Sequence, residues 1–210
     1  HYDRVGGLEV ARTGDDDRMM ELKRKVASGK AFGTNVKMIS AAEAKALFPL
    51  LEEDMIQGAM WDPDAGLVKP RSQTVAGILV DNAVKTGKAQ SFANTNATGL
   101  DIKDGRIVGV DTSRGYIAAN HVIVCTGLWG RTIAEMAGED LPVMPVDHPL
   151  TFFGPYTEFE GTGKDIGYPL MRDQGNSAYM RDTGDPKTPE GGQIEWGYYE
   201  EKEPRLLHPR

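Results

Sequence analysis

The hydrophobic pattern of the first third of the chain switches between the period of a strand and that of a helix. Apolar and polar residues alternate over Gly7–Arg12, which is typical of a strand with one buried face. Met19, Leu22 and Val26 then recur on one side of a helix. A capping box that starts at Thr13 predicts where this helix begins.

A second helix and strand follow. Ser40–Glu43 is a clean capping box, and the helix it opens ends before Pro49, which cannot continue a helix. Met55–Trp61 has the pattern of another strand. The first third therefore predicts a mixed α+β unit.

The middle third opens with a longer predicted helix. It begins within Lys69–Ser72 and ends at Gly87, a good helix terminator. Its apolar positions share one face: Val75, Ile78, Leu79 and Ala83. A short strand is predicted at Gln90–Ala93.

Three strands in succession are predicted next. Ala97–Lys103 and Arg106–Thr112 are joined by Asp104-Gly105, a favoured two-residue hairpin turn. Tyr116–Ala118 adds a third strand to this meander. The continuous apolar run His121–Cys125 predicts a strand that is covered on both faces.

A glycine-containing turn at Thr126–Gly130 and a helix that closes at Gly138 complete this region. Helix, strand, three-strand meander, buried strand, glycine turn and helix follow each other in the order of many flavin-binding α/β domains. The last third returns to strands, predicted at Val143–Phe153, Tyr168–Arg172, Ser177–Arg181 and Gln193–Tyr199.

Composition excludes several classes of protein. The 210 residues include 31 acidic and 24 basic side chains, a net charge of −7 without a basic stripe, so nucleic-acid binding is not expected. Apolar runs of about five residues are too short for a membrane helix. The single Cys125 excludes an intrachain disulfide framework. We expect a cytoplasmic protein, or one of the mitochondrial matrix if a targeting segment precedes His1.

Motifs for several common activities are absent from the sequence. There is no G-x-G-x-x-G run after a buried strand and hence no dinucleotide fingerprint. The scattered histidines and the lone cysteine match no zinc signature, so no metal site is expected. Gly-x-Ser-x-Gly is also missing, which leaves a nucleophile-elbow hydrolase without support.

Several segments together resemble one known family. They are Ala97–Thr112, Gly115–Gly130, Leu141–His148, Tyr168–Gln174 and Ala178–Asp185. In this order and spacing the sequence is similar to the FAD-dependent amine oxidoreductases of the D-amino-acid oxidase superfamily. Within it, the sequence is most similar to the dimethylglycine and sarcosine dehydrogenase and oxidase group.

The resemblance implies an α+β architecture of two parts. Residues 1–67 and 141–210 would form a substrate-binding domain, a mixed or antiparallel sheet with helices. Residues 68–140 would form a partial FAD-binding α/β half that contains the three-strand meander. Members of the family begin with a strand, a G-x-G-x-x-G run and a helix, and this sequence lacks that run. We therefore expect an internal fragment of such a protein. Alone it should be inactive, because FAD would lack its main phosphate-binding site.

The resemblance also implies an active site. His148 and Tyr179 match the family's catalytic histidine and tyrosine. Hydride transfer from the carbon beside nitrogen needs an unprotonated amine. A histidine can orient the substrate nitrogen and accept its proton, and a tyrosine hydroxyl can form a hydrogen bond that completes the arrangement. Arg172 or Arg181 would bind the carboxylate of a small N-methylated amino acid such as sarcosine or dimethylglycine.

Four residues are implied to contact FAD. Ala97 would lie beside the adenine end, and Thr126, Gly127 and Trp129 would lie against the cofactor, where the missing side chain of glycine permits close approach. The flavin would perform the redox step and the protein would position the substrate.

Two other classes of function stay open. The chain is alternatively a non-catalytic substrate-domain module, which would bind an N-methylated amino acid without FAD. It is alternatively a subunit whose FAD site is completed by a second chain, which would expose apolar surface until that partner binds. A nicotinamide dehydrogenase is a third alternative, against which the absent fingerprint counts.

Overall fold

The computed structural model describes residues 2–69, 72–162, 165–189, 191–200 and 202–207. The chain divides into two compact units. The first consists of His1–Val75 with His148–Pro204, and the second of Ala76–Asp147 with Arg205–Arg210. The roles predicted for residues 1–67, 68–140 and 141–210 stay predictions.

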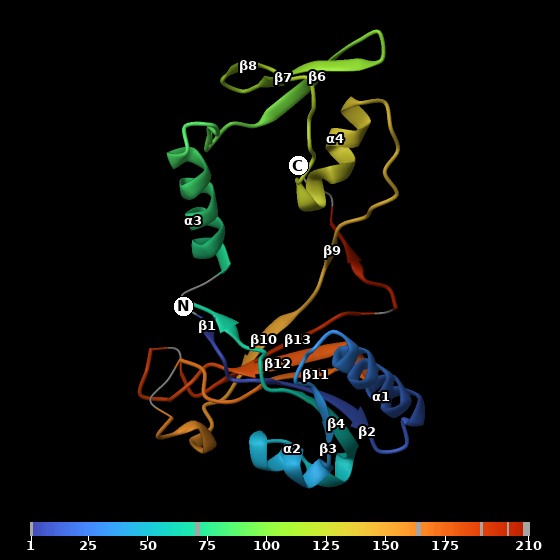
Figure 1. The fold of residues 1–210 in the computed structure, drawn as a ribbon, viewed down its shortest axis with the longest axis vertical. Helices are drawn as coiled ribbons and strands as arrows, with labels where there is room; N and C mark the ends of the chain where they lie inside the picture. Colours follow the sequence, from blue (N-terminus) through green and yellow to red (C-terminus); the bar gives the residue numbers. More distant parts are fainter. Residues whose placement is uncertain (1, 70–71, 163–164, 190, 201, 208–210) are drawn as a thin grey trace. The chain divides into compact units, whose positions relative to one another are not determined.

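The first unit is built on a seven-stranded mixed sheet in the order β10-β13-β12-β11-β2-β4-β3 (Figure 1). Its strands are β2 (Gly7–Arg12), β3 (Lys37–Ile39), β4 (Ile56–Asp62), β10 (Leu150–Phe153), β11 (Leu170–Asp173), β12 (Ala178–Asp182) and β13 (Ile194–Tyr198). β11 runs parallel to β2, and the other neighbours are antiparallel. One sheet thus joins the two ends of the sequence, and the predicted α+β class with a mixed sheet is confirmed.

Helices pack on both faces of this sheet. α1 (Asp16–Ala31) lies over the face that carries Glu9, to which Lys25 donates a hydrogen bond of 2.6 Å. α2 (Ala41–Leu47) lies over the opposite face, where Phe48 joins a core with Leu8. Apolar burial on the α2 face and the contacts of α1 on the other face hold the sheet in place. The neighbouring strands β11, β12, β13 and β10 are thereby positioned at the other end of the sheet.

The two predicted helix starts have different outcomes. The capping box of α2 is confirmed: the Ser40 hydroxyl accepts from the Glu43 N–H, and the Glu43 carboxylate accepts from the Ser40 N–H. The prediction that Thr13 caps α1 is wrong. Asp15 caps it instead by accepting from the Arg18 N–H, because the Thr13 hydroxyl donates to the Asp54 carbonyl.

Short elements complete the first unit. They are β1 (Tyr2–Asp3), which pairs with β5 (Leu67–Val68), and the 3₁₀ turns η1 (Glu53–Met55), η3 (Thr157–Phe159) and η4 (Gln174–Asn176). The predicted strand Val143–Phe153 divides into β9 (Val146–Asp147) and β10, which lie on either side of Pro149. Proline lacks the N–H that a continuous ladder needs.

The second unit contains the predicted meander. It consists of β6 (Ala97–Lys103), β7 (Arg106–Thr112) and β8 (Gly115–Ala118). Asp104 and Gly105 have φ of +51° and +72°, as a two-residue hairpin turn between right-twisted strands requires.

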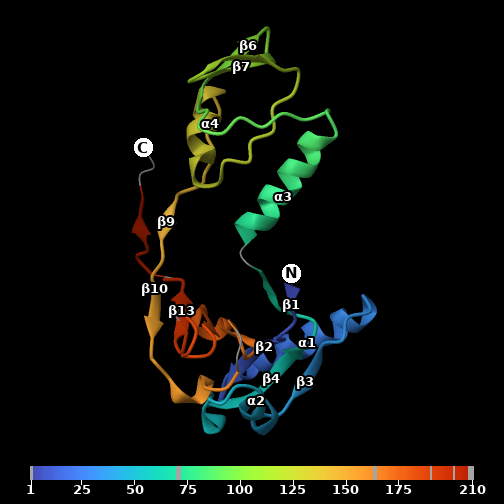
Figure 2. The same cartoon turned by 90° about the vertical axis from the view of Figure 1, so that its left-hand side faces the viewer.

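Helices and a short strand pair make up the rest of that unit. α4 (Gly130–Met136) follows the 3₁₀ turn η2 (Gly127–Trp129) and lies against β6 (Figure 2). β9 pairs with β14 (Arg205–Leu206). α3 (Ser72–Lys85) forms as predicted, but it has no buried residue, and Pro70 and Arg71 lie outside the described residues.

Two predicted strands are wrong. Gln90–Ala93 and His121–Cys125 form no strand, and Ile123, in the second of them, is 86% exposed. An apolar run becomes a buried strand only beside strands that accept its backbone hydrogen bonds. No strand in the described part of the chain pairs with His121–Cys125. The side chains of Ile123 and Val124 therefore lie exposed.

Candidate functional site

One face of the sheet is incompletely covered where β10, β13, β12 and β11 lie side by side. Directly opposite residues in an antiparallel pair point to the same face. The register pairs Arg172 with Tyr179, Tyr179 with Gly197, and Arg181 with Glu195. We call this surface the open face; its side chains are Leu150, Phe152, Arg172, Tyr179, Arg181 and Glu195.

Tyr179 lies across the neighbouring strand. A Cβ on Gly197 would come within 2.3 Å of the ring carbon that bears the Tyr179 hydroxyl, so only glycine leaves room for the ring in this position. Burial raises the pKa of the Tyr179 hydroxyl above its ordinary value, and Tyr199 and Glu195 raise it further. The hydroxyl is therefore protonated near neutral pH and can donate a hydrogen bond.

His148 lies at the end of the same face. Its Nδ1 is 3.2 Å from a carboxylate oxygen of Glu200. When Nδ1 carries the proton of this hydrogen bond, Nε2 is left as an acceptor. The carboxylate thus fixes the orientation of the ring and selects the nitrogen that can take up a proton.

Tyr199 links the two predicted catalytic residues. Its ring packs edge-on against His148 at 4.8 Å between centroids and lies 5.6 Å from the ring of Tyr179. The structure therefore gathers His148, Tyr199 and Tyr179 in one aromatic row. Sequence analysis did not identify Tyr199 and Glu200 as site residues. Their contacts with His148 depend on the pairing of β10 with β13, which no local sequence pattern reveals.

The two arginines differ in their partners. Arg181 donates a hydrogen bond from Nη2 to the carboxylate of Glu195, directly opposite on β13. Arg172 is exposed next to Tyr179, and no acidic side chain pairs with it among the described residues. Both lie on the open face, as the substrate-binding prediction requires, but only Arg172 has its whole guanidinium available.

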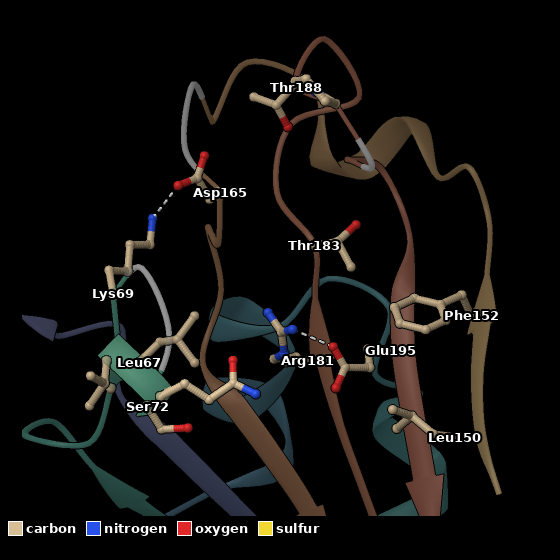
Figure 3. Close-up of a pocket in the computed structure, with 14 residues that line it drawn as sticks. Leu67, Lys69, Ser72, Leu150, Phe152, Asp165, Arg181, Thr183, Thr188 and Glu195 are labelled. Carbon is tan, nitrogen blue, oxygen red and sulfur yellow. Dashed lines mark hydrogen bonds and ion pairs between the residues drawn. The ribbon is translucent and has the colours of Figure 1, made fainter. Parts of the chain in front are cut away.

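A cavity of about 840 Å³ adjoins the open face (Figure 3). Its walls include Leu67, Lys69, Leu150, Phe152, Arg181 and Glu195. The Lys69 ammonium at its side is held by Asp165 at 2.7 Å and by Asp3 at 2.8 Å. Of the predicted site residues, Arg181 lines this cavity, whereas His148, Arg172 and Tyr179 do not.

The residues predicted to contact FAD lie in the second unit. Thr126, Gly127 and Trp129 share the turn before α4, and Ala97 begins β6. Gly127 has a φ of +55°, and a Cβ added there would meet open space. Trp129 is 48% exposed.

This turn fits part of a large flat cofactor. Its backbone is approachable, and the apolar side chains of Ile123, Val124, Leu128 and Trp129, in the turn or just before it, are each exposed, so an aromatic ring system can pack against them. The fit extends to rings and not to a pyrophosphate, because the chain lacks a glycine-rich phosphate cradle.

Among the described residues no three histidine, cysteine or acidic side chains cluster as metal ligands would. Within the same part of the chain, no helix has the length and apolar character needed to cross a membrane.

Comparison with known proteins gives consistent matches. The protein-family model described as FAD dependent oxidoreductase (DAO) matches residues 1–207. Mitochondrial sarcosine dehydrogenase of Mus musculus is 31% identical over 185 residues, which is 86% of this chain and 19% of that protein. Mitochondrial dimethylglycine dehydrogenase of Rattus norvegicus is 27% identical over 184 residues, 88% of this chain and 21% of that protein.

A solved structure supports the fold. L-proline dehydrogenase from P. horikoshii superposes with a TM-score of 0.74 at 25% identity, covering 95% of this chain and 50% of that one. The chain therefore spans about a fifth of the length of the two curated relatives and half of this structural neighbour.

Proposed function

The chain belongs to the FAD-dependent oxidoreductase family, and from this membership we propose that its open face binds a small N-methylated amino acid such as sarcosine or dimethylglycine. The C–N bond of this substrate would be oxidised by hydride transfer from the carbon beside nitrogen, giving an iminium that water hydrolyses. Relatives named sarcosine and dimethylglycine dehydrogenase support this substrate class.

The grouping of His148, Tyr199 and Tyr179 on one face beside Arg172 carries the proposal. Nε2 of His148 accepts the proton that the substrate amine must lose before hydride transfer. The Tyr179 hydroxyl donates a hydrogen bond that holds the substrate, and an arginine of the open face binds its carboxylate. Aromatic rings exclude water around the reacting carbon.

FAD, when bound, supplies the hydride acceptor. The turn Thr126–Trp129 would hold one of its rings, with the Gly127 backbone in close approach and Trp129 in contact with a ring face. Ala97 would lie at the adenine end.

Flavin reduction tests this function. The protein is loaded with FAD, in the presence of a polypeptide that supplies a G-x-G-x-x-G unit if the chain alone takes up none. It is then mixed anaerobically with dimethylglycine, and the loss of visible flavin absorbance is followed. We expect bleaching that His148→Gln abolishes and that Tyr179→Phe slows. Tyr198→Phe is the matched control, because Tyr198 lies on the opposite face of β13. Unbleached flavin in the unsubstituted protein, or equal loss from both tyrosine variants, contradicts the proposal.

A second candidate function rests on the exposed apolar side chains of the second unit. Ile78 and Leu79 on α3 are 52% and 65% exposed, and Ile123 is 86% exposed. α3 has no buried residue, and an apolar helix face that is left exposed is typical of an interface. The chain would then be a subunit that takes up FAD only with a second polypeptide that carries a G-x-G-x-x-G unit. FAD binding that requires this addition favours the second candidate; FAD binding by the chain alone refutes it.

A further inference from the structure

The cavity beside the open face contains a charge pair whose members both retain free hydrogen-bonding groups. Arg181 and Glu195 point toward one another in its wall (Figure 3). A guanidinium has five N–H donors and a carboxylate has two oxygens. The contact uses Nη2 of Arg181 and Oε2 of Glu195, and no other hydrogen bond of either side chain is present among the described residues.

The charges that line the cavity are balanced. Lys69 and Arg181 are positive, whereas Asp165 and Glu195 are negative. The Glu195 side chain is 17% exposed and that of Arg181 is 32% exposed, so water screens the pair only in part. A lone anion that entered would leave an uncompensated negative charge in this half-buried site, whereas a zwitterion would not.

Apolar side chains flank the pair. Leu67 lies on one side of it and Phe152 and Leu150 on the other (Figure 3). The register places Glu195 directly between Arg181 and Phe152 across the three strands. A ligand that contacts Glu195 through a cationic nitrogen can therefore lay methyl groups on that nitrogen against Phe152 and Leu150.

We propose that this cavity binds the zwitterionic form of a small N-alkylated amino acid, with its carboxylate on Arg181 and its ammonium on Glu195. Glu195 is then the residue that selects zwitterions over simple carboxylates. The identity of the ligand as the substrate rests on the proposed function; binding of the zwitterion does not. Tyr179 precedes Arg181 by two positions on β12, about 7 Å along the strand, so Tyr179 and the cavity share the open face.

Calorimetric titration of the chain with two ligands of equal shape tests this assignment. N,N-dimethylglycine is a zwitterion, and 3-methylbutanoate has the same branched outline and carboxylate but no nitrogen. Loss of a hydrogen bond to a charged group changes affinity about tenfold or more. We therefore expect dimethylglycine to bind at least about tenfold tighter, and Glu195→Gln to abolish this preference.

Two further variants make the result specific. Glu195→Asp keeps the charge and should keep the preference for dimethylglycine, which also separates loss of charge from loss of folding. Glu52→Gln removes a glutamate charge at a 73% exposed side chain and should leave both affinities unchanged. Thermal melting of each variant confirms that it is folded.

The results separate this inference from the proposed function. Equal affinity of the unsubstituted chain for the two ligands, binding of neither, or a preference that survives Glu195→Gln overturns the zwitterion site. If dimethylglycine reduces the flavin but the preference survives Glu195→Gln, only this inference fails. If Glu195→Gln abolishes the preference but dimethylglycine leaves the flavin oxidised, only the proposed function fails.

Discussion

Replacement of Gly197 by alanine should disable the open face through Tyr179. The added Cβ would lie 2.3 Å from both the hydroxyl-bearing carbon and the hydroxyl oxygen of Tyr179, whereas ordinary contacts begin at 3.4 Å. The ring must therefore move by about 1 Å, and a displacement of this size between a catalytic group and its substrate can cost about a hundredfold in rate. Gly197 has no positive φ, so backbone strain adds nothing.

Gly109→Ala is the matched control. Its Cβ would lie 2.1 Å from the hydroxyl oxygen of Tyr116 in the meander, which contributes no side chain to the open face. Both substitutions overpack a glycine–tyrosine contact and should destabilise the fold by about 1–3 kcal/mol. Only Gly197→Ala should also slow flavin reduction by dimethylglycine, measured on FAD-loaded protein under anaerobic conditions.

A double-mutant cycle identifies the route of the effect. If Gly197→Ala acts through the tyrosine, it should cause little further loss of rate once Tyr179→Ala has removed the ring. Equal rates for the Gly197→Ala and Gly109→Ala variants, or additive losses in the double variant, would refute the reasoning.

Three predictions concern stability. Asp182→Ala should cost about 3 kcal/mol in chemical denaturation, because the buried carboxylate accepts hydrogen bonds from three backbone N–H groups; an unchanged midpoint would contradict this. Lys25→Met should cost about 1–3 kcal/mol in the same assay, since it leaves the carboxylate of Glu9 buried without its cation, an effect reduced by the partial exposure of Lys25. Hydrogen bonds from Ser40 lower the pKa of Glu43, so their stabilisation is present above the ordinary carboxyl pKa and is lost as pH falls through the lowered pKa. The melting temperatures of Glu43→Gln and the unsubstituted chain should therefore differ at neutral pH and converge in acid, and a constant gap would refute this assignment.

Elements specified by local chemistry could be predicted from the sequence. The Asp104-Gly105 turn fixed the hairpin, because both positions need positive φ. The capping box at Ser40 fixed the start of α2. His121–Cys125 could not be predicted, because its apolar pattern describes a strand only where other strands cover it.

Only part of the candidate site could be predicted from the sequence. His148 and Tyr179 were predicted through a family resemblance, but their contacts depend on pairings between strands far apart in the sequence. The parallel pairing of β11 with β2 and the antiparallel pairing of β10 with β13 have no local signal. The sequence alone therefore could not show that Glu195 lies opposite Arg181 or that Tyr199 packs against His148.

The most direct test of the account is an anaerobic titration of the FAD-loaded protein with dimethylglycine, read as loss of flavin absorbance. Saturable bleaching that requires His148 is the predicted result. The account is contradicted if the flavin stays oxidised with both sarcosine and dimethylglycine. It is also contradicted if the protein takes up no FAD, either alone or with a polypeptide that supplies a G-x-G-x-x-G unit.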